Sequence, residues 1–327
     1  MLKYVFAMDK LRSLDESLAR INRDINALLD GVDKAVYDHE KTSFNFMGKA
    51  VRSRFTLLFG DALGLERGTA ERISAAAELI HTASLLHDDC IDRAALRRGL
   101  PTLNESLGIN TAILVGDMVV SFAFDYAVKI TPDTPGSLVR AVRRMTEGAL
   151  LEENLRYKNT SAAEAERILQ LKTGELFRWC ALTACHMAKK PELYEVCGTI
   201  GRETGVIFQI TDDVLDFEGE AGQTGKDALK DITEGRTTLP LILALNDPRF
   251  AVEIKAELTS LKTDLSGNLA PALRIADLVK KNGFCAGARA IAAEKMRSLE
   301  KEIARLPERA AAGTFKNYIY ALSSRTK

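Results

Sequence analysis

The sequence predicts an all-α protein built as a helical bundle, and two observations carry that prediction. Segments such as ERISAAAELIHTASLLHDD (71–89) and EVCGTIGRETGVIFQITDDVLDF (195–217) place apolar residues at three- and four-residue steps, the period of a helix packed on one side. Only eight prolines occur in 327 residues. Alternating apolar and polar runs and Asn-Gly or Asp-Gly turns are nearly absent, so long helices are expected rather than a sheet.

Three short segments break the helical pattern. They are residues 97–101 (RRGLP), 131–136 (TPDTPG) and 218–238, and the last is rich in Gly and charge, which predicts a mobile loop. None resembles an interdomain linker. Residues 1–327 are therefore expected to form one domain, with roughly the first twenty residues as a peripheral part.

Composition excludes several classes of protein. Lys plus Arg equals Asp plus Glu at 45 each, so no bulk charge favours nucleic acid. The most apolar stretch, residues 111–128, contains Asp117 and Asp125 and predicts a core helix rather than a membrane span. The apolar stretch before Asp9 is too short for a secretory signal. Five scattered cysteines without a C-x-x-C pair indicate reduced thiols in a cytoplasmic protein.

Two Asp-Asp-x-x-Asp clusters each follow an apolar helical run. Asp88 and Asp92 are four residues apart, as are Asp212 and Asp216, so each pair lies on one helix face. Carboxylates one turn apart repel each other, and a single cluster is more typical of a solvated charged face than of a binding site. The same spacing twice favours a site where a hard divalent cation relieves the repulsion.

The residues around the clusters favour a magnesium-bound diphosphate as the ligand. Magnesium takes one or two protein carboxylates and keeps its other positions for water and phosphate. His81 lies nearly two turns before Asp88, and Gln209 lies three residues before Asp212, so each shares a face with its cluster. A lone His on an amphipathic helix is as often a packed side chain, but beside an Asp cluster a phosphate donor is the better interpretation.

Basic residues gather near the same places. Taken singly, each is typical of an exposed surface charge. As a set that flanks two carboxylate clusters, they match what phosphate groups need, namely guanidinium forks, ammonium charges and a closing loop. The set consists of Lys49, Arg52, Arg97, Arg98, Lys172, Lys226 and Lys230.

At these residues the sequence resembles the trans-isoprenyl diphosphate (polyprenyl) synthases, over most of the chain from Asn45 onward. IHTASLLHDDCID followed by RRG is similar to the first aspartate-rich motif of that family, and GVIFQITDDVLDF to the second. FMGKAVR, KTGELF and GRTTLP are similar to its Gly-Gly-Lys-x-x-Arg, Lys-Thr and post-motif segments. The resemblance implies a bundle of the isoprenoid synthase type around a central cavity, usually as a homodimer.

The resemblance also implies a role for each residue. Isopentenyl diphosphate would be bound by Lys49, Arg52, His81 and Arg98. The allylic diphosphate would be bound by Arg97, Lys172, Gln209 and Lys226. Catalysis would involve Lys172, Thr173 and Gln209. Magnesium, three ions in this family, would be held by Asp88, Asp92, Asp212 and Asp216. Asp89 and Asp213 point about 100° away by helical phase, so they are expected to support these ligands from behind.

The implied reaction is a prenyl transfer. Magnesium, Lys and Arg neutralise the allylic diphosphate so that it leaves, and isopentenyl diphosphate attacks the resulting cation head-to-tail to give an all-trans polyprenyl diphosphate. No side chain is an obvious base for the final proton, and the released diphosphate is a sufficient one. The allylic primer and the downstream pathway stay open.

Product length is expected to depend on the residues before the first cluster. In this family they close the product tunnel, and short-chain enzymes usually place an aromatic side chain there. Ala83 and Ser84 are small, which favours a product of more than fifteen carbons. A deeper stop could come from Met118 and Phe122, which share a face with Tyr126, although ordinary core packing explains these three better.

Departures from the family pattern leave the main residues in place. Met47 and Ala50 replace a usual Gly and Arg, and Arg236 replaces a Lys. Asp227 and Leu229 replace a Pro and a Gly in the loop, which leaves the role of Lys230 open.

Other classes of protein fit less well. A terpene cyclase or a squalene-type synthase would lack Lys49 and Arg52, and a non-catalytic partner subunit commonly lacks one Asp cluster. A di-iron bundle needs two Glu-x-x-His pairs, whereas only Glu78 and His81 match.

Overall fold

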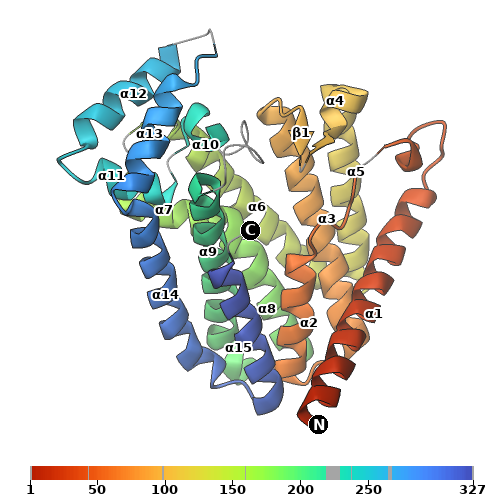
Figure 1. The fold of residues 1–327 in the computed structure, drawn as a ribbon. Coiled ribbons are helices and arrows are strands. Elements are labelled where there is room, and N and C mark those ends of the chain that lie inside the picture. Colours follow the sequence, from red (N-terminus) through yellow and green to blue (C-terminus); the bar gives the residue numbers. More distant parts are fainter. Residues whose placement is uncertain are drawn as a thin grey trace. The chain divides into compact units, whose positions relative to one another are not determined.

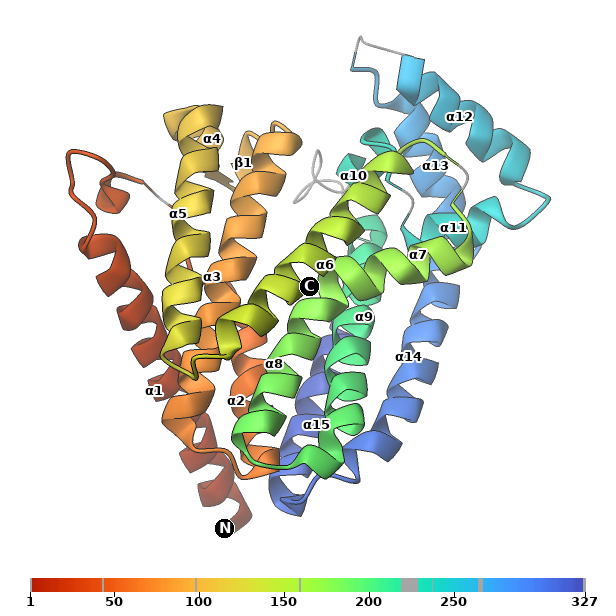
Figure 2. The same ribbon diagram turned by 180° about the vertical axis from the view of Figure 1, so that it is seen from behind.

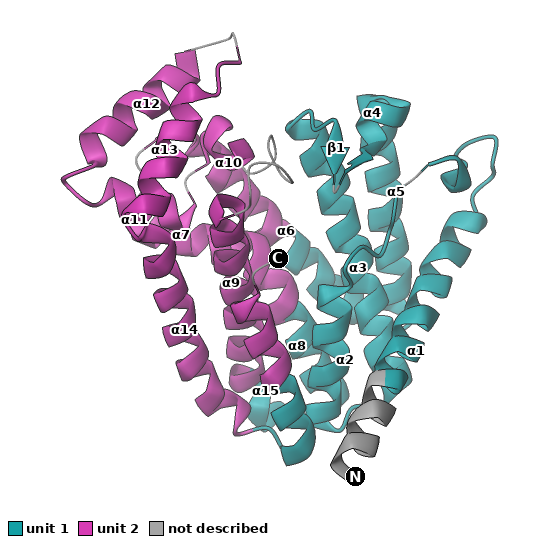
Figure 3. Ribbon diagram, in the orientation of Figure 1, with its two compact units in different colours: residues 1–142, 179–194, 306–315 teal, residues 143–178, 195–305, 316–327 magenta. Residues whose placement is uncertain are grey.

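The structure is a computed structural model that describes residues 2–42, 44–97, 99–158, 160–218, 229–236, 238–263 and 267–325, with side chains from residue 12 onward. It divides into two compact units (Figure 3). The first comprises Met1–Val142, Trp179–Tyr194 and Leu306–Phe315, and the second comprises Arg143–Arg178, Glu195–Arg305 and Lys316–Lys327. The chain passes repeatedly between them, so neither unit is a continuous segment.

The described part of the chain is almost entirely helical, which confirms the predicted fold class (Figures 1 and 2). The first unit contains α1 (Leu2–Asp30), η1 (His39–Lys41), α2 (Val51–Leu63), α3 (Arg67–Ile91), β1 (Leu96–Arg97), β2 (Leu100–Pro101), α4 (Leu103–Leu107), α5 (Ile109–Val128) and η3 (Pro191–Leu193). The second contains α7 (Ala162–Ile168), η2 (Leu169–Gly174), α10 (Lys230–Thr233), α11 (Leu239–Leu245), α12 (Ala251–Thr263), α13 (Ala270–Lys281) and α14 (Phe284–Ile303). Each of the remaining helices has residues in both units: α6 (Thr134–Asn154), α8 (Glu175–Met187), α9 (Tyr194–Glu218) and α15 (Arg309–Ser324).

In the first unit, α3 is the central helix. It packs against α1, α2 and α5, and the figures show α3 and α5 side by side from both directions (Figures 1 and 2). Phe55 and Phe59 on α2 contact Phe315 on α15, with ring centroids 5.3 to 5.4 Å apart. Burying large aromatic side chains is a leading source of core stability, so this cluster stabilises the contact between α2 and α15.

Local sequence explains where α2 ends and α3 begins. Gly64, with φ +73°, closes α2 in the left-handed conformation that glycine adopts without a steric penalty. Glu66 then accepts hydrogen bonds from the N–H groups of Gly68 and Thr69 at 2.7 and 2.6 Å. This carboxylate cap satisfies donors that the first turn of α3 would otherwise leave unpaired.

The break predicted at residues 131–136 is shorter than expected. Helix α6 already begins at Thr134, so Pro135 lies in its first turn. Proline fits there because the first helical N–H groups need no partner within the helix and its φ is already helical. The break at residues 97–101 forms the β1–β2 pair, in which Leu96 pairs with Pro101 and Arg97 with Leu100.

Helix α5 meets the length and composition that a membrane span requires, and it alone does so in the part of the chain that the structure describes. In the most apolar window, 39% of the helix is buried within the protein. Ala112, Val115 and Val119 lie in the core, while Leu114 is 67% exposed. The outward side of the helix is therefore mixed, because Asp117, Ser121 and Asp125 are exposed there as well.

In the second unit, a single apolar cluster joins α9 to the helices that follow it. Val206, Ile210 and Val214 on α9 are fully buried with Leu241 of α11 and Ile275 of α13. They recur every four residues, the spacing that places side chains on one helix face. The opposite face of α9 is thereby left for its polar residues.

Candidate active site

The first Asp cluster belongs to a partly exposed stripe along α3. His81, Ser84, Asp88 and Asp92 recur at three- and four-residue steps and all keep some solvent access. Ala83 lies off this stripe and is only 1% exposed. Of the two small residues proposed to control product length, Ser84 thus shares the accessible face of the metal-binding candidates, whereas Ala83 is core.

Asp89, the second residue of the cluster, is buried and holds Arg97. The Arg97 Nε and Nη2 atoms each lie 2.8 Å from an Asp89 carboxylate oxygen, a two-bond pairing between α3 and β1. Such paired bonds fix the plane of the guanidinium group as well as its position. Asp89 therefore orients a residue predicted to bind diphosphate. Arg98, the next residue, lies outside the described residues.

The two predicted phosphate ligands near α2 differ in exposure. Lys49 is exposed in the turn before the helix, and its ammonium group can meet a ligand directly. Arg52 is only 6% exposed, and its charge faces the buried carboxylate of Glu78 on α3. Periodicity alone could not indicate this burial, because it results from the packing of α2 on α3.

The second Asp cluster repeats the pattern on α9. Gln209 and Asp212 are partly exposed and Asp216 is exposed, whereas Asp213 is only 4% exposed. Burial raises the pKa of Asp213 to about 7, against the hydrogen bond from Gln209 that lowers it. Burial and the charges of neighbouring carboxylates, above all Asp231, raise the pKa of Asp216 to about 8. Asp216 keeps an exposed edge, and its crowding with other carboxylates shifts the pKa in the same upward direction as its burial.

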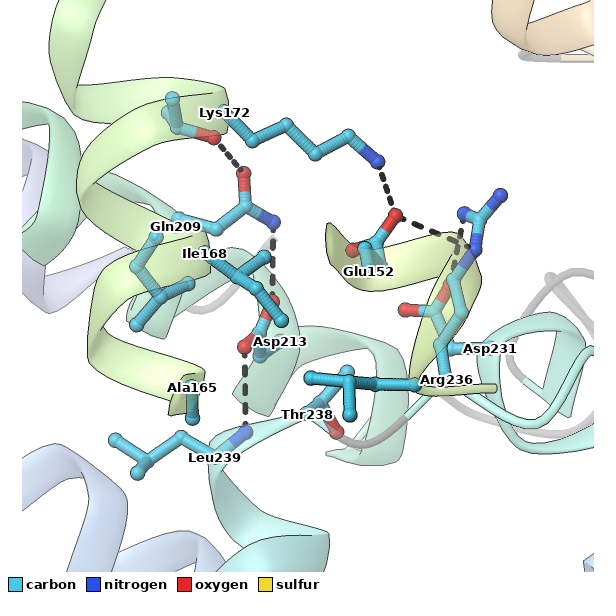
Figure 4. A pocket seen from close by; sticks show the side chains of 13 residues that line it. Glu152, Ala165, Ile168, Lys172, Gln209, Asp213, Asp231, Arg236, Thr238 and Leu239 are labelled. Carbon is cyan, nitrogen blue, oxygen red and sulfur yellow. Dashed lines mark hydrogen bonds and ion pairs between the residues drawn. The ribbon is translucent and has the colours of Figure 1, made fainter. Parts of the chain in front are cut away.

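A chain of hydrogen bonds fixes Gln209 (Figure 4). The Thr173 hydroxyl donates to Gln209 Oε1 at 2.9 Å, and Gln209 Nε2 donates to Asp213 Oδ1 at 3.0 Å. The other Asp213 oxygen accepts from the Leu239 N–H at 3.4 Å. Each polar group of the amide thus has one partner, which decides how the side chain is turned.

Gln209 and Asp213 line a pocket with a volume of about 90 Å³, and charged residues line it too (Figure 4). Lys172 and Arg236 both point toward Glu152, with N–O distances of 2.6 and 3.8 Å. Arg236 also meets Asp231 at 3.4 Å. Glu152 and Asp231 were not among the predicted site residues. No motif marks Glu152, and Asp231 was hidden in a charged loop, so only packing reveals them.

Lys172 and Thr173 lie in η2, a single π-helical turn, Leu169–Gly174, between α7 and α8. Such turns are rare and often occur at functional sites. Neighbouring helices pack closely against this turn. A Cβ added at Gly148 would lie 2.7 Å from the Lys172 backbone nitrogen. One added at Gly205 would lie 2.7 Å from the Gly174 Cα. Glycine at these positions lets α6 and α9 approach the turn that carries both residues.

Arg325, near the end of α15, reaches the second cluster. Its guanidinium group pairs with Asp212 and lies over the Phe208 ring, 4.4 Å from the ring centroid. Sequence reasoning did not find this residue, because nothing in the C-terminal segment marks it. Lys226 falls outside the described residues, as does most of the predicted loop at 218–238, and Lys230 pairs with Glu234 at 3.7 Å.

Comparison with known proteins identifies the family of this chain. Residues 34–266 match the family model described as polyprenyl synthetase. The chain belongs to the polyprenyl synthetase family. Its predicted motifs and helical fold agree with that membership.

Relatives within the polyprenyl synthetase family differ in their named products. The chain is 31% identical to an all-trans-nonaprenyl-diphosphate synthase from Rhodobacter capsulatus, over 74% of this chain and 75% of the relative. It is 31% identical to an octaprenyl diphosphate synthase from Haemophilus influenzae, over 74% of each. A farnesyl diphosphate synthase from the same bacterium is 32% identical over 71% of this chain and 85% of its own.

A solved member of the family has the same fold. The crystal structure of a polyprenyl synthase from Caulobacter crescentus, complexed with calcium and isoprenyl diphosphate, superposes with a TM-score of 0.85. The alignment covers 97% of both chains at 28% identity.

Proposed function

We propose that this protein is a magnesium-dependent prenyltransferase that joins isopentenyl diphosphate head-to-tail to an allylic diphosphate. The product is an all-trans polyprenyl diphosphate of more than fifteen carbons, as in the octaprenyl and nonaprenyl relatives. The arrangement on α9 carries the proposal. Asp212 and Asp216 keep solvent access, while Asp213 turns inward to hold Gln209 beside Lys172 and Thr173.

The donor set fits magnesium. Asp212 and Asp216 present carboxylates on one face of α9. Burial and the charges of neighbouring carboxylates raise the pKa of Asp216, and a cation relieves the repulsion among them. No group of three His, Cys, Asp or Glu side chains forms a metal cage within the described residues. Magnesium suits such an open set because it keeps positions for water and phosphate. We infer that Asp88, Asp92, Asp212 and Asp216 hold it, as three ions, and when bound it neutralises the charge of the leaving diphosphate.

The side chains of this protein would bind and orient the substrates. Lys172 and Arg97 are proposed to bind oxygens of the allylic diphosphate, with Lys226. Lys49, Arg52, His81 and Arg98 would bind isopentenyl diphosphate. Both Arg97 and Gln209 are already held by buried carboxylates. These two side chains therefore need little rearrangement when charge develops on the reacting substrates.

The proposed reaction needs no redox partner. The bond between the allylic C1 and its oxygen breaks, and the electron pair leaves with the diphosphate. The π electrons of isopentenyl diphosphate form the new carbon–carbon bond, and a proton is lost to the released diphosphate as the new double bond forms. The amide of Gln209 and the hydroxyl of Thr173 would stabilise the positive charge through their dipoles.

One assay tests the proposal. Purified protein is incubated with magnesium, isopentenyl diphosphate and each allylic primer in turn, and the chain length of the product is measured. We expect elongation beyond fifteen carbons that stops when magnesium is chelated. Failure to elongate any primer would remove the enzymatic function, and a fifteen-carbon limit would remove the long-chain product.

We also propose that the protein acts as a single catalytic domain, that two copies form a homodimer, and that it works in the cytoplasm without inserting into a membrane. The exposed apolar side chains of α5, including Ile113, Leu114 and Val128, favour a protein partner for that face. The five cysteines are free and buried, which suits a reducing compartment.

A further inference from the structure

The start of α2 depends on a side chain from another helix. The residue before the helix, Ala50, has no side-chain acceptor, and it adopts φ +51°. The first N–H groups of a helix need partners from outside the helix. Here Glu78 of α3 supplies one: its Oε1 accepts from the Ser53 N–H at 2.8 Å and from the Ser53 hydroxyl at 3.0 Å. A carboxylate 25 residues away thus caps α2.

The segment before α2 is tied to the same face of α3. Thr82, one turn after Glu78, donates its hydroxyl to the Phe46 carbonyl at 2.5 Å. Asn45 adds local support by accepting from the N–H groups of Met47 and Gly48 at 3.0 Å each. Residues 46–53 are therefore anchored at both ends by α3, and Lys49 and Arg52 lie between the anchors.

The anchored segment is strained, which makes the anchors necessary. A left-handed backbone suits Gly48 (φ +55°) but not Ala50, whose Cβ crowds the backbone there. Such conformations are energetically unfavourable and persist only where surrounding contacts enforce them. Glu78 and Thr82 are 1% and 3% exposed, so their hydrogen bonds are shielded from competing water.

The charges of Glu78 and Arg52 also favour a role for Glu78 in holding α2. An ionised carboxylate buried this deeply is costly unless a positive charge lies nearby. Burial raises the pKa of Glu78, and the charge of Arg52 and the hydrogen bonds from Ser53 oppose that rise. Glu78 therefore faces Arg52 as a counter-charge while it caps the helix on which Arg52 lies. His81, between Glu78 and Thr82 in sequence, lies on the partly exposed stripe of α3.

We propose that Glu78 and Thr82 are positioning residues for the binding of isopentenyl diphosphate. They hold the backbone of residues 46–53 so that the cationic side chains of Lys49 and Arg52 keep one geometry relative to His81. This inference rests on the proposed function. It assigns to α3 a role beyond its carboxylates, because the same helix fixes the element that would bind the second substrate.

The sharpest test is Thr82→Val, which keeps the shape of the side chain and removes the donor to Phe46. Losing a buried hydrogen bond and leaving the carbonyl unpaired costs enough to raise the KM for isopentenyl diphosphate about tenfold. The KM for the allylic diphosphate and the kcat should change less than about threefold. Thr82→Ser, which restores the hydroxyl, should return the KM to near the original value.

A matched control comes from the same helix. Ser74 is also fully buried, but its hydroxyl donates within α3, to the Ala70 carbonyl at 2.7 Å. Ser74→Ala should leave both KM values unchanged. Glu78→Asp provides a second variant: it keeps the charge but shortens the side chain, so it should also raise only the KM for isopentenyl diphosphate.

Binding is measured independently of turnover by calorimetric titration of each variant with isopentenyl diphosphate alone. Weaker binding by folded Thr82→Val, as judged by circular dichroism, supports the inference. Unchanged binding, or an equal loss for both substrates, overturns it. If the unsubstituted protein neither binds nor converts isopentenyl diphosphate, the proposed function itself fails, which is a distinguishable result.

Discussion

In each Asp cluster, two carboxylates keep access to solvent and one turns inward. Asp88 and Asp92 stay partly exposed while Asp89 grips Arg97, and Asp212 and Asp216 stay accessible while Asp213 grips Gln209. The division follows from helical phase, because the second residue lies about 100° from the first and about 60° from the third, which are themselves only about 40° apart. The accessible carboxylates can meet a cation, and the inward ones orient polar neighbours.

The accessible carboxylates should be essential for turnover. We expect Asp88→Ala and Asp212→Ala each to lower kcat at least about a hundredfold, because charge stabilisation at the leaving group is lost. Helix content, followed by circular dichroism, should not change. Asp277→Ala is the matched control. Asp277 forms an exposed ion pair with Lys281, so this variant should leave kcat unchanged. Full activity in either site variant would remove that Asp from the metal site.

The second cluster also predicts a pH dependence of stability without metal. The pKa of Asp213 rises from 3.8 to about 7, and that of Asp216 from 3.8 to about 8. The folded state therefore holds these protons more tightly, so the stabilisation is complete below about pH 4 and is lost as pH rises through 7 and 8. Melting temperatures in chelator should fall over this window and recover with magnesium. Asp216→Asn should flatten the fall; an equally steep profile in that variant would contradict the assignment.

At the scale of elements, close helix packing shapes the π-helical turn that carries Lys172 and Thr173. The glycines at 148, 174 and 205 allow this approach, since added Cβ atoms would lie within 2.7 to 3.1 Å of neighbouring backbone or side-chain atoms. The turn is therefore a product of interlocking helices as well as of its own sequence.

Gly205→Ala should disturb this turn. Overpacking of this kind typically costs about 1–3 kcal/mol of unfolding free energy, and kcat should fall with it as Thr173 shifts. Gly313→Ala on α15 is the control, because an added Cβ there has no neighbour within 4 Å. It should be neutral or stabilise by about 0.4–1 kcal/mol. Denaturant unfolding of both variants measures the difference, and equal stabilities would contradict the packing argument.

Helices α3 and α5 together offer a test of product length. Ser84 is partly exposed on the stripe that carries Asp88, and Met118 and Phe122 are partly buried on α5. If growing product passes Ser84, Ser84→Phe should shorten the main product by one or more five-carbon units, as read by mass spectrometry. Ser121→Phe, at an exposed position of α5, serves as control. Unchanged product length in Ser84→Phe would move the stop elsewhere, with Met118 and Phe122 as the next candidates.

At the scale of the whole molecule, the outward side of α5 exposes several apolar side chains. Its outward face exposes Ile109, Ile113, Leu114 and Val128 beside the charged Asp117 and Asp125, and exposed apolar side chains gathered in this way favour a protein partner. A second copy of the chain is the proposed partner.

Leu114→Lys should weaken that association, since it replaces the most exposed apolar side chain of α5 with a charge. Sedimentation analysis should show dimers for the unsubstituted protein and monomers for the variant. Leu273→Lys, at an exposed position of α13, should leave the dimer intact. A monomeric unsubstituted protein, or one that floats with lipid vesicles, would contradict the proposed partner.

The helical fold and the identity of the two clusters could be predicted from the sequence because both depend on local spacing. Apolar residues at three- and four-residue steps predict a helix, and carboxylates four residues apart must share a face. The tertiary structure decided the partners: Glu78 as the cap of α2, Glu152 as the contact of Lys172, and the burial of Ala83 and Arg52. These contacts join residues far apart in the chain. They depend on how helices pack against one another, which no local period encodes.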